Sequence, residues 1–244
     1  MDKAIQYAVV VFLLSIVNAA LAGETVNLPS DNSQWTPMPQ MEIGKVKRLS
    51  KDQLSPDLKA FAEKQMAESQ RGYEIVPEEL FVYSSNYRNR LRLEDEVKSK
   101  LQVKLADINS TELKEYVYEG IIPEGPRIDG PWTSATRVFK RPDGVTLMLT
   151  EWDYIADGGA IVAVSELMNV TVANVPAMLS VKKSPSGKTV TMLEWSTDKK
   201  SFTITVWDDV DMKRKGREYD RKWLLNLANL ISGIVGSPIS PLRQ

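Results

Sequence analysis

Apolar and polar side chains alternate along much of the second half of this chain, and this alternation constrains the fold most strongly. Val145, Leu147 and Leu149 lie at every second position, and the turn sequence at 141–144 separates them from a similar stretch around Val138. A strand points successive side chains to opposite faces of a sheet, so alternation on both sides of a Pro-Asp-Gly turn indicates a β-hairpin. We therefore expect an antiparallel sheet in this half.

Further stretches downstream also have strand character. They cover residues 170–173, 177–181, 189–195 and 202–206. The stretch 160–168 is largely apolar and fits either a short helix or a strand, because periodicity does not distinguish the two over so short a run.

Helical periodicity is strongest at the two flanks of this region. Ser55 is placed to cap a helix that has Pro56 in its first turn and ends at Arg71-Gly72. The apolar side of a last amphipathic helix comprises Trp223, Leu224, Leu227, Ala228 and Ile231.

The stretch from 93 to 108 fits two structures. Its apolar residues recur at spacings of three and four, which favours a helix. Leu101, Val103 and Leu105 also alternate, as they would in a strand. We expect a helix here.

Strands gathered in one stretch with helices at both ends indicate an α+β fold, in which an antiparallel sheet packs against helices. A helical extension precedes the sheet. The expected organisation is a signal peptide at 1–22, an extended leader at 23–49, a helical region at 50–118, an α+β domain at 119–235 and a tail at 236–244.

The first residues have the order of an export signal. A short polar start leads into the apolar run Ala8–Val17, and Ala20-Leu21-Ala22 supplies small residues for cleavage. That order predicts removal of the signal near Ala22 and a periplasmic or secreted chain without a transmembrane helix. The alternative is an uncleaved anchor, because Ala4–Ala22 approaches the about 20 apolar residues that span a bilayer.

Histidine and cysteine are absent from the sequence. Without them, Ser-His and Cys-His catalysis is excluded, the preferred ligands of zinc, copper and iron are missing, and no disulfide can form. The 31 basic residues are matched by 32 acidic ones, so the basic excess typical of nucleic-acid binding is missing too. We expect no metal site, no cofactor and no nucleic-acid partner.

Short motif matches are few. Asp208-Asp209-Val210-Asp211 resembles the opening of a calcium loop, but Lys213 and Arg214 stand where that loop needs an oxygen ligand and a glycine. Asn109-Ser110-Thr111 and Asn169-Val170-Thr171 match the acceptor pattern for N-glycosylation, which arises often by chance.

A series of segments between residues 119 and 232 carries a family resemblance. It comprises Ile122-Pro123-Glu124-Gly125, the hairpin segment Val145–Trp152, the run 172–179, Leu193-Glu194-Trp195, Phe202-Thr203-Ile204 and the run 227–231. This series resembles the extracytoplasmic domain of unknown function found in bacterial anti-sigma-factor regulators and envelope lipoproteins. That domain is similar in style to the half-barrel of periplasmic lipoprotein carriers. The resemblance implies this kind of fold and an envelope role, and it implies no catalytic residue.

Carboxylates beside aromatic rings are the best candidates for chemistry. Glu151 and Asp153 flank Trp152 at the end of a predicted strand, where alternation places both carboxylates on one face. Paired carboxylates carry acid–base catalysis in glycosidases, although a solvated strand end is the simpler interpretation. Glu194 and Trp195 form a second acid–aromatic pair with the same two interpretations.

Tryptophans are the candidates for ligand binding. Trp152, Trp195 and Trp207 all fall on predicted strands. On an open sheet face their rings would line an apolar groove, which is the usual form of a ligand site. Packing in the core is the simpler interpretation.

Three functions fit these observations. The first is an exported, non-enzymatic envelope protein that binds or senses a protein segment or an apolar, lipid-like ligand. The second is a cell-wall or polysaccharide hydrolase that uses Glu151 and Asp153. The third is a structural accessory protein of the envelope. Alanine at either carboxylate would abolish hydrolysis and leave binding nearly unchanged.

Overall fold

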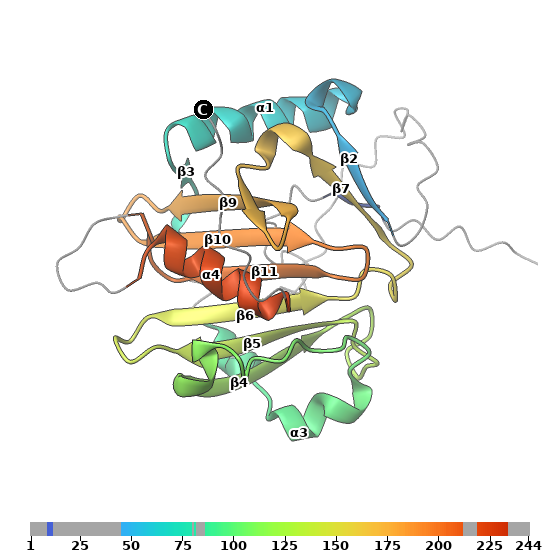
Figure 1. Ribbon diagram of the computed structural model, residues 1–244, viewed down its shortest axis with the longest axis vertical. Coiled ribbons are helices and arrows are strands. Elements are labelled where there is room, and N and C mark those ends of the chain that lie inside the picture. Colours follow the sequence, from blue (N-terminus) through green and yellow to red (C-terminus); the bar gives the residue numbers. More distant parts are fainter. Residues whose placement is uncertain (1–8, 12–44, 80, 82–85, 212–218, 234–244) are drawn as a thin grey trace, which may run out of the picture.

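The computed structural model describes residues 9–11, 45–79, 81, 86–211 and 219–233. They form two β-sheets with helices around them (Figure 1). The strands are β1 (Val9–Val11), β2 (Val46–Leu49), β3 (Glu74–Ile75), β4 (Val117–Glu124), β5 (Ser134–Lys140), β6 (Thr146–Trp152), β7 (Ala160–Val164), β8 (Val170–Val172), β9 (Val175–Lys183), β10 (Thr189–Ser196) and β11 (Ser201–Val206). The helices are α1 (Pro56–Gln70), α3 (Glu94–Val97), α4 (Arg221–Ile231) and the short 3-10 segments η2 (Lys51–Gln53), η3 (Asn86–Arg90), η4 (Lys98–Lys100), η5 (Glu112–Glu115) and η6 (Ser165–Leu167).

The large sheet has eight strands. Their order is β3-β9-β10-β11-β6-β5-β4, and β8 pairs with β9 outside this path. All pairs are antiparallel except β3 with β9. The small sheet has the order β1-β7-β2, and both of its pairs are parallel. The predicted α+β class, with an antiparallel sheet packed against helices, is therefore confirmed.

The alternating stretches form the predicted strands. β5 and β6 are the expected hairpin, paired from Lys140 with Thr146 to Ser134 with Trp152. The largely apolar stretch 160–168 contains both candidate structures, because strand β7 is followed by the short helical segment η6.

A second hairpin, β8–β9, is closed by a tight turn and by a side chain. Ala173 and Asn174 have positive φ angles of 51° and 63°, the backbone that matches the twist of a two-residue hairpin turn. Asn169 precedes β8, and its amide group accepts from the backbone nitrogen of Leu179 and donates to the Leu179 carbonyl, both at 2.8 Å. The side chain of Asn169 therefore continues the ladder along β9.

Helix α4 crosses one face of the large sheet, as its amphipathic pattern predicts (Figure 1). Its buried residues pack on inward side chains from β5, β6, β9, β10 and β11. They are Leu224, Leu227, Ala228 and Ile231. Fully burying one leucine side chain contributes roughly 2 kcal/mol, so apolar burial is the main force that holds α4 in place.

Arg141 joins the beginning of α4 to the β5–β6 turn. Its guanidinium carbon lies 4.4 Å from the ring centre of Tyr219, 4.8 Å from that of Trp223 and 5.3 Å from that of Tyr116. Its Nη1 also donates to the Tyr116 hydroxyl at 2.6 Å. Cation–aromatic contacts contribute about 0.5–2 kcal/mol each, more where water is excluded, and Arg141 is 9% exposed.

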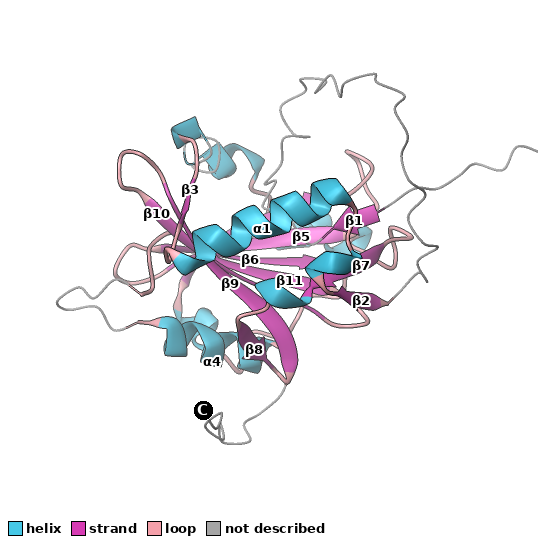
Figure 2. Cartoon of the chain, turned by 90° about the horizontal axis from the view of Figure 1, so that it is seen from above, coloured by secondary structure: helices cyan, strands magenta, loops and turns pink. Residues whose placement is uncertain are grey.

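Separate groups of residues cover the opposite face of the large sheet. Over β9, helix α1 packs with β7 and η6, through Ala62, Val164 and Met178. Near β4 and β5, Tyr87 of η3 packs on Val138. Figure 2 shows α1 on the side of the strands away from α4, and the small sheet beside the right-hand ends of the strands.

The helix predicted over 93–108 is wrong for most of that range, because helical structure is limited to α3 and η4. Beyond them Leu101 forms a parallel bridge with Trp132, and Val103 packs on Ile121 of the sheet. Apart from that one bridge, no strand forms here either, because contact with the sheet outweighed intrinsic helix propensity without adding a regular strand.

Most of the predicted signal peptide and leader lies outside the described residues. Its described parts are strands β1 and β2, which flank β7 in the small sheet. The predicted tail at 236–244 also lies outside them. Among the described residues, no helix is long and apolar enough to cross a membrane.

Gly120 makes a bulge in β4 possible and provides a test of the sheet edge. Its φ is +139°, and a Cβ there would lie 2.8 Å from the Arg92 carbonyl oxygen, which is fixed by a hydrogen bond from Ile121. We expect Gly120→Ala to lower the free energy of unfolding by about 3 kcal/mol, through backbone strain and overlap. Gly144→Ala is the matched control, since its φ is +85° with open space around the site, and it should cost about 1 kcal/mol. Urea titration of both variants measures the difference, and equal losses would contradict this account.

Candidate functional site

The three candidate tryptophans lie in three different surroundings. Trp195 is 1% exposed and stacks on Phe202, with ring centres 4.9 Å apart, in the core beneath α4. Trp207 meets the edge of Phe81 at 6.2 Å. Trp152 donates from its ring nitrogen to Asp157 at 2.6 Å. The structure therefore does not gather these rings around one groove.

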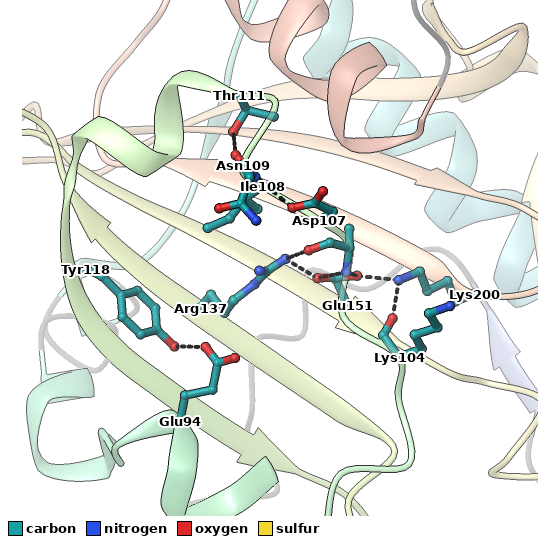
Figure 3. Close-up of polar contacts among 11 residues, drawn as sticks. Glu94, Lys104, Asp107, Ile108, Asn109, Thr111, Tyr118, Arg137, Glu151 and Lys200 are labelled. Atoms are coloured by element: carbon teal, nitrogen blue, oxygen red, sulfur yellow. Dashed lines mark hydrogen bonds and ion pairs between the residues drawn. The ribbon is translucent and has the colours of Figure 1, made fainter.

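The two candidate carboxylates also separate. Glu151 is fully buried, whereas Asp153 lies in the turn after β6, where it accepts from the backbone nitrogen of Ala156 at 2.9 Å. Glu151 accepts from Nη2 of Arg137 at 2.6 Å, from the backbone nitrogen of Ala106 and from the Lys200 ammonium (Figure 3). Its oxygens are thus occupied by groups of the protein itself.

The Glu151 cluster fastens a distant segment to the sheet. Arg137 Nη2 also donates to the Ala106 carbonyl at 2.8 Å, and Lys200 donates to the Lys104 carbonyl at 2.6 Å (Figure 3). The three charged side chains come from β5, β6 and the β10–β11 turn, and together they hold residues 104–107. We conclude that Glu151 is a structural anchor.

Removing the charge of Glu151 should expose this dependence. We expect Glu151→Gln to lower the free energy of unfolding by about 3–5 kcal/mol, because the buried Arg137 and the partly buried Lys200 lose their counter-ion. Lys199→Met is the control, since Lys199 is exposed beside Lys200, and it should stay within about 0.5 kcal/mol of the native chain. Chemical denaturation measures the free energy of unfolding of both variants. If Glu151→Gln loses no more than Lys199→Met, Glu151 is not a structural anchor.

A cleft lies between the small sheet and the large one. Its lining residues are Val46, Arg48, Ile161, Ala163, Met168, Pro176, Glu194, Trp195 and Ser196. It has room for about one water molecule, about 10 Å³, and the wider empty space of about 270 Å³ includes open solvent. Sites for drug-sized ligands run from about 300 to 1,000 Å³, so the cleft as it stands fits a water molecule or the tip of one polar group.

Two polar groups with unsatisfied hydrogen bonding line this cleft. Glu194 and Ser196 are 5% and 7% exposed, and neither Oε2 of Glu194 nor Oγ of Ser196 has a hydrogen-bond partner. Alternation places both on the face of β10 opposite the Trp195 ring. A buried polar atom without a partner costs about 1–3 kcal/mol. A bound group that donates hydrogen bonds would remove that cost.

A row of threonine side chains lies beside Glu194 on the neighbouring strands. In cross-strand register with it stand Thr203 of β11, Thr150 of β6 and Thr136 of β5. The Thr136 and Thr150 hydroxyls bond each other at 2.7 Å. This face is polar in its middle, in contrast to the apolar face beneath α4.

Glu194 has an unusual electrostatic environment. Burial raises the pKa of Glu194 to about 7, the Lys182 ammonium lowers it and the Glu74 carboxylate raises it. Lys182 Nζ lies 3.3 Å from Glu74 Oε2, so the cation pairs with the other carboxylate. Glu194 therefore changes charge near neutral pH without a direct ion pair among the described residues.

The sequence marks Glu194 by a second feature besides its position next to Trp195. Glu194 is the one charged residue in the run Thr189–Ser196, which marks it as an acid on a buried strand. Arg48 and Val46 were missed because they fall in the predicted leader. No sequence pattern indicated that β2 joins β7 beside β10.

The raised pKa of Glu194 predicts how stability depends on pH. A carboxyl group whose folded pKa lies above its unfolded value stabilises the fold below the unfolded pKa, and this stability is lost as pH rises through the folded pKa. The two values are 4.5 and about 7. Relative to Glu194→Gln, the native chain should lose on the order of 3 kcal/mol between these pH values. Denaturation curves across the range test this, and parallel pH profiles would contradict it.

Comparison of the chain with models of protein families found no match, and neither curated proteins nor solved structures gave one. The resemblance of residues 119–232 to an extracytoplasmic envelope domain thus stays a prediction. Among the described residues, no three acidic side chains gather as a metal site would require.

Proposed function

We propose that this chain is an exported, non-enzymatic envelope protein that binds a small partner group in the cleft between its two sheets. One observation carries the proposal: Glu194 and Ser196 line the cleft with buried oxygens that lack hydrogen-bond partners. Stable folds pair almost all such atoms. The position of these two oxygens in one cleft supports a site that a bound group completes.

The positions of the other carboxylates support binding over hydrolysis. A catalytic carboxylate has to reach the bond that it protonates or attacks. Glu151 is fully buried and occupied by Arg137 and Lys200, and Asp153 lies outside the strand in a turn. The pair on which a hydrolase would depend therefore has little support.

The size of the cleft supports one ligand class over another. Its enclosed room, about that of one water molecule, is far too small for a lipid chain, whereas the polar tip of a side chain from a protein segment would fit. Apolar walls and a polar floor suit a compact ligand with a polar end. We therefore favour this kind of ligand over a lipid-like one.

Filling the cleft should remove binding. Ala163 is 8% exposed and lines the cleft, so Ala163→Leu places a larger side chain in the empty space. We expect native mass spectrometry of the chain purified from the envelope to show a bound small molecule that this variant loses. Ala156→Leu, at an exposed turn position, should keep it, and thermal unfolding confirms that both variants fold. An empty native chain, or polysaccharide turnover lost in Asp153→Ala, would contradict the proposal.

Export is a separate part of the proposal. The intact mass of the chain isolated from the periplasm or medium should correspond to a start near Gly23. Cleavage there would also remove β1 and leave one edge of β7 unpaired. A membrane-bound chain that retains residues 1–22 would favour the uncleaved anchor instead.

A further inference from the structure

Strand β7 has the composition of a central strand. Its sequence is Ala-Ile-Val-Ala-Val, and all five side chains are buried. Val164 packs with Ala62 of α1, whereas Ile161 and Ala163 line the cleft beside β10. The strand is thus covered on both faces, as strands of parallel sheets usually are.

The two neighbours of β7 in the small sheet differ in kind. On one side lies β2, whose Lys47 and Arg48 supply the charges that protect an exposed edge strand. On the other side lies β1, and its residues Val9–Val11 belong to the apolar run of the predicted signal peptide. Cleavage near Ala22 would remove β1 and make β7 an edge strand without a charged residue or a proline. Proteins rarely leave such an edge unpaired.

The backbone groups on that edge follow from the register. The Ile161 amide donates to the Lys45 carbonyl at 3.4 Å, so Ile161 directs its backbone groups to β2. Successive residues of a strand direct these groups to opposite edges, so Val162 directs its own to β1. A strand that replaces β1 would therefore gain backbone hydrogen bonds as well as apolar contact.

The leader and the tail of the mature chain offer no replacement for β1. Proline aside, residues 23–44 contain no two adjacent apolar side chains, and their three prolines lack the amide that a strand donates. Residues 234–244 contain one such pair, which Gly236 and Pro238 follow. A second copy fits poorly too, because β1 runs parallel to β7, whereas two copies of β7 related by a two-fold axis would pair antiparallel.

We propose that the mature chain binds an extended, apolar segment of another envelope protein as a strand parallel to β7, in the place of β1. The inference rests on the export and binding functions proposed above, and it names the partner as a protein segment. The middle residue of that segment would take the place of Val10, which pairs with Ile161. Paired residues of neighbouring strands share a face, so its side chain would lie on the same face as the cleft residues Ile161 and Ala163.

Fluorescence anisotropy of a labelled peptide tests the inference. The peptide has the sequence Ala-Val-Val-Val-Phe of residues 8–12, with lysines at both ends for solubility. We expect saturable binding to the chain that begins at Gly23. The chain that retains residues 1–22 should bind at least about tenfold more weakly, because its own β1 occupies the edge at a high effective concentration.

Methyl groups on the peptide backbone distinguish strand pairing from apolar contact alone. The residue beside Ile161 directs its amide to β7, because Ile161 directs its own to β2. N-methylation of the middle valine should therefore weaken binding about tenfold or more, through a lost hydrogen bond and the bulk of the methyl group. N-methylation of the third valine, whose amide points away from β7, should change binding less than about twofold. Val162→Pro removes a donor from the same edge of the chain and should also weaken binding, with thermal unfolding as the check that it folds; if it does not fold, the two peptides decide.

Three results would overturn the inference. The first is a folded mature chain that binds no peptide, and the second is equal binding of the two N-methylated peptides. The third is a mature chain that sediments as a dimer and becomes a monomer in Val162→Pro, because a second copy would then occupy the edge.

These results are separate from those that test the earlier proposals. If the chain from the envelope begins near Gly23 and carries a molecule that Ala163→Leu loses, export and the cleft site stand, and a failure of the peptide removes only the strand partner. If that chain retains residues 1–22, export fails, β7 keeps β1 as its neighbour and the present inference fails with it.

Discussion

The burial of one sheet face beneath α4 is the interaction on which the rest of the structure depends. Six strands, β5, β6, β8, β9, β10 and β11, contribute inward side chains to this core, and residues 106–116 close it beside the helix. Arg141 fixes the start of the helix to the β5–β6 turn through the rings of Tyr219 and Trp223, and Asn229 fixes the middle by accepting from the backbone nitrogen of Ala173 at 2.7 Å. Because both contacts reach turns between strands, the position of α4 and the register of the sheet are set together.

The face of the large sheet opposite α4 is built differently. Its apolar contacts are divided among small clusters, and threonine and serine hydroxyls occupy the space between them. A polar face of this kind contributes little to stability, and it holds the carboxyl group of Glu194 without the two direct ion pairs that Glu151 has on the face beneath α4. The sheet thus separates two tasks: one face supplies the stability of the fold, and the other presents polar groups to the cleft.

Local patterns predicted the sheet well, because a strand that buries one face has to alternate. The same reasoning failed for 93–108, where Leu101 and Val103 follow the sheet instead of completing a helix. Glu151 lay on a predicted strand end, but its partner Lys200 and the segment at 104–107 come from elsewhere in the chain. The cleft was beyond sequence reasoning for the same reason. It exists only where β2 and β7 approach β10, three segments far apart along the chain.

The amide of Asn169 has a consequence for how this chain is produced. Both of its polar atoms bind the backbone of Leu179, and it is also the first residue of an Asn-Val-Thr acceptor pattern. An oligosaccharide attached to Nδ2 would replace one amide hydrogen and add bulk where the side chain meets β9. In a host whose secretory pathway attaches such sugars, the modifying enzyme and the closing hairpin would compete for the same nitrogen. Glycoforms would then differ in how firmly this edge of the sheet is held, a heterogeneity that production in a host without that pathway avoids.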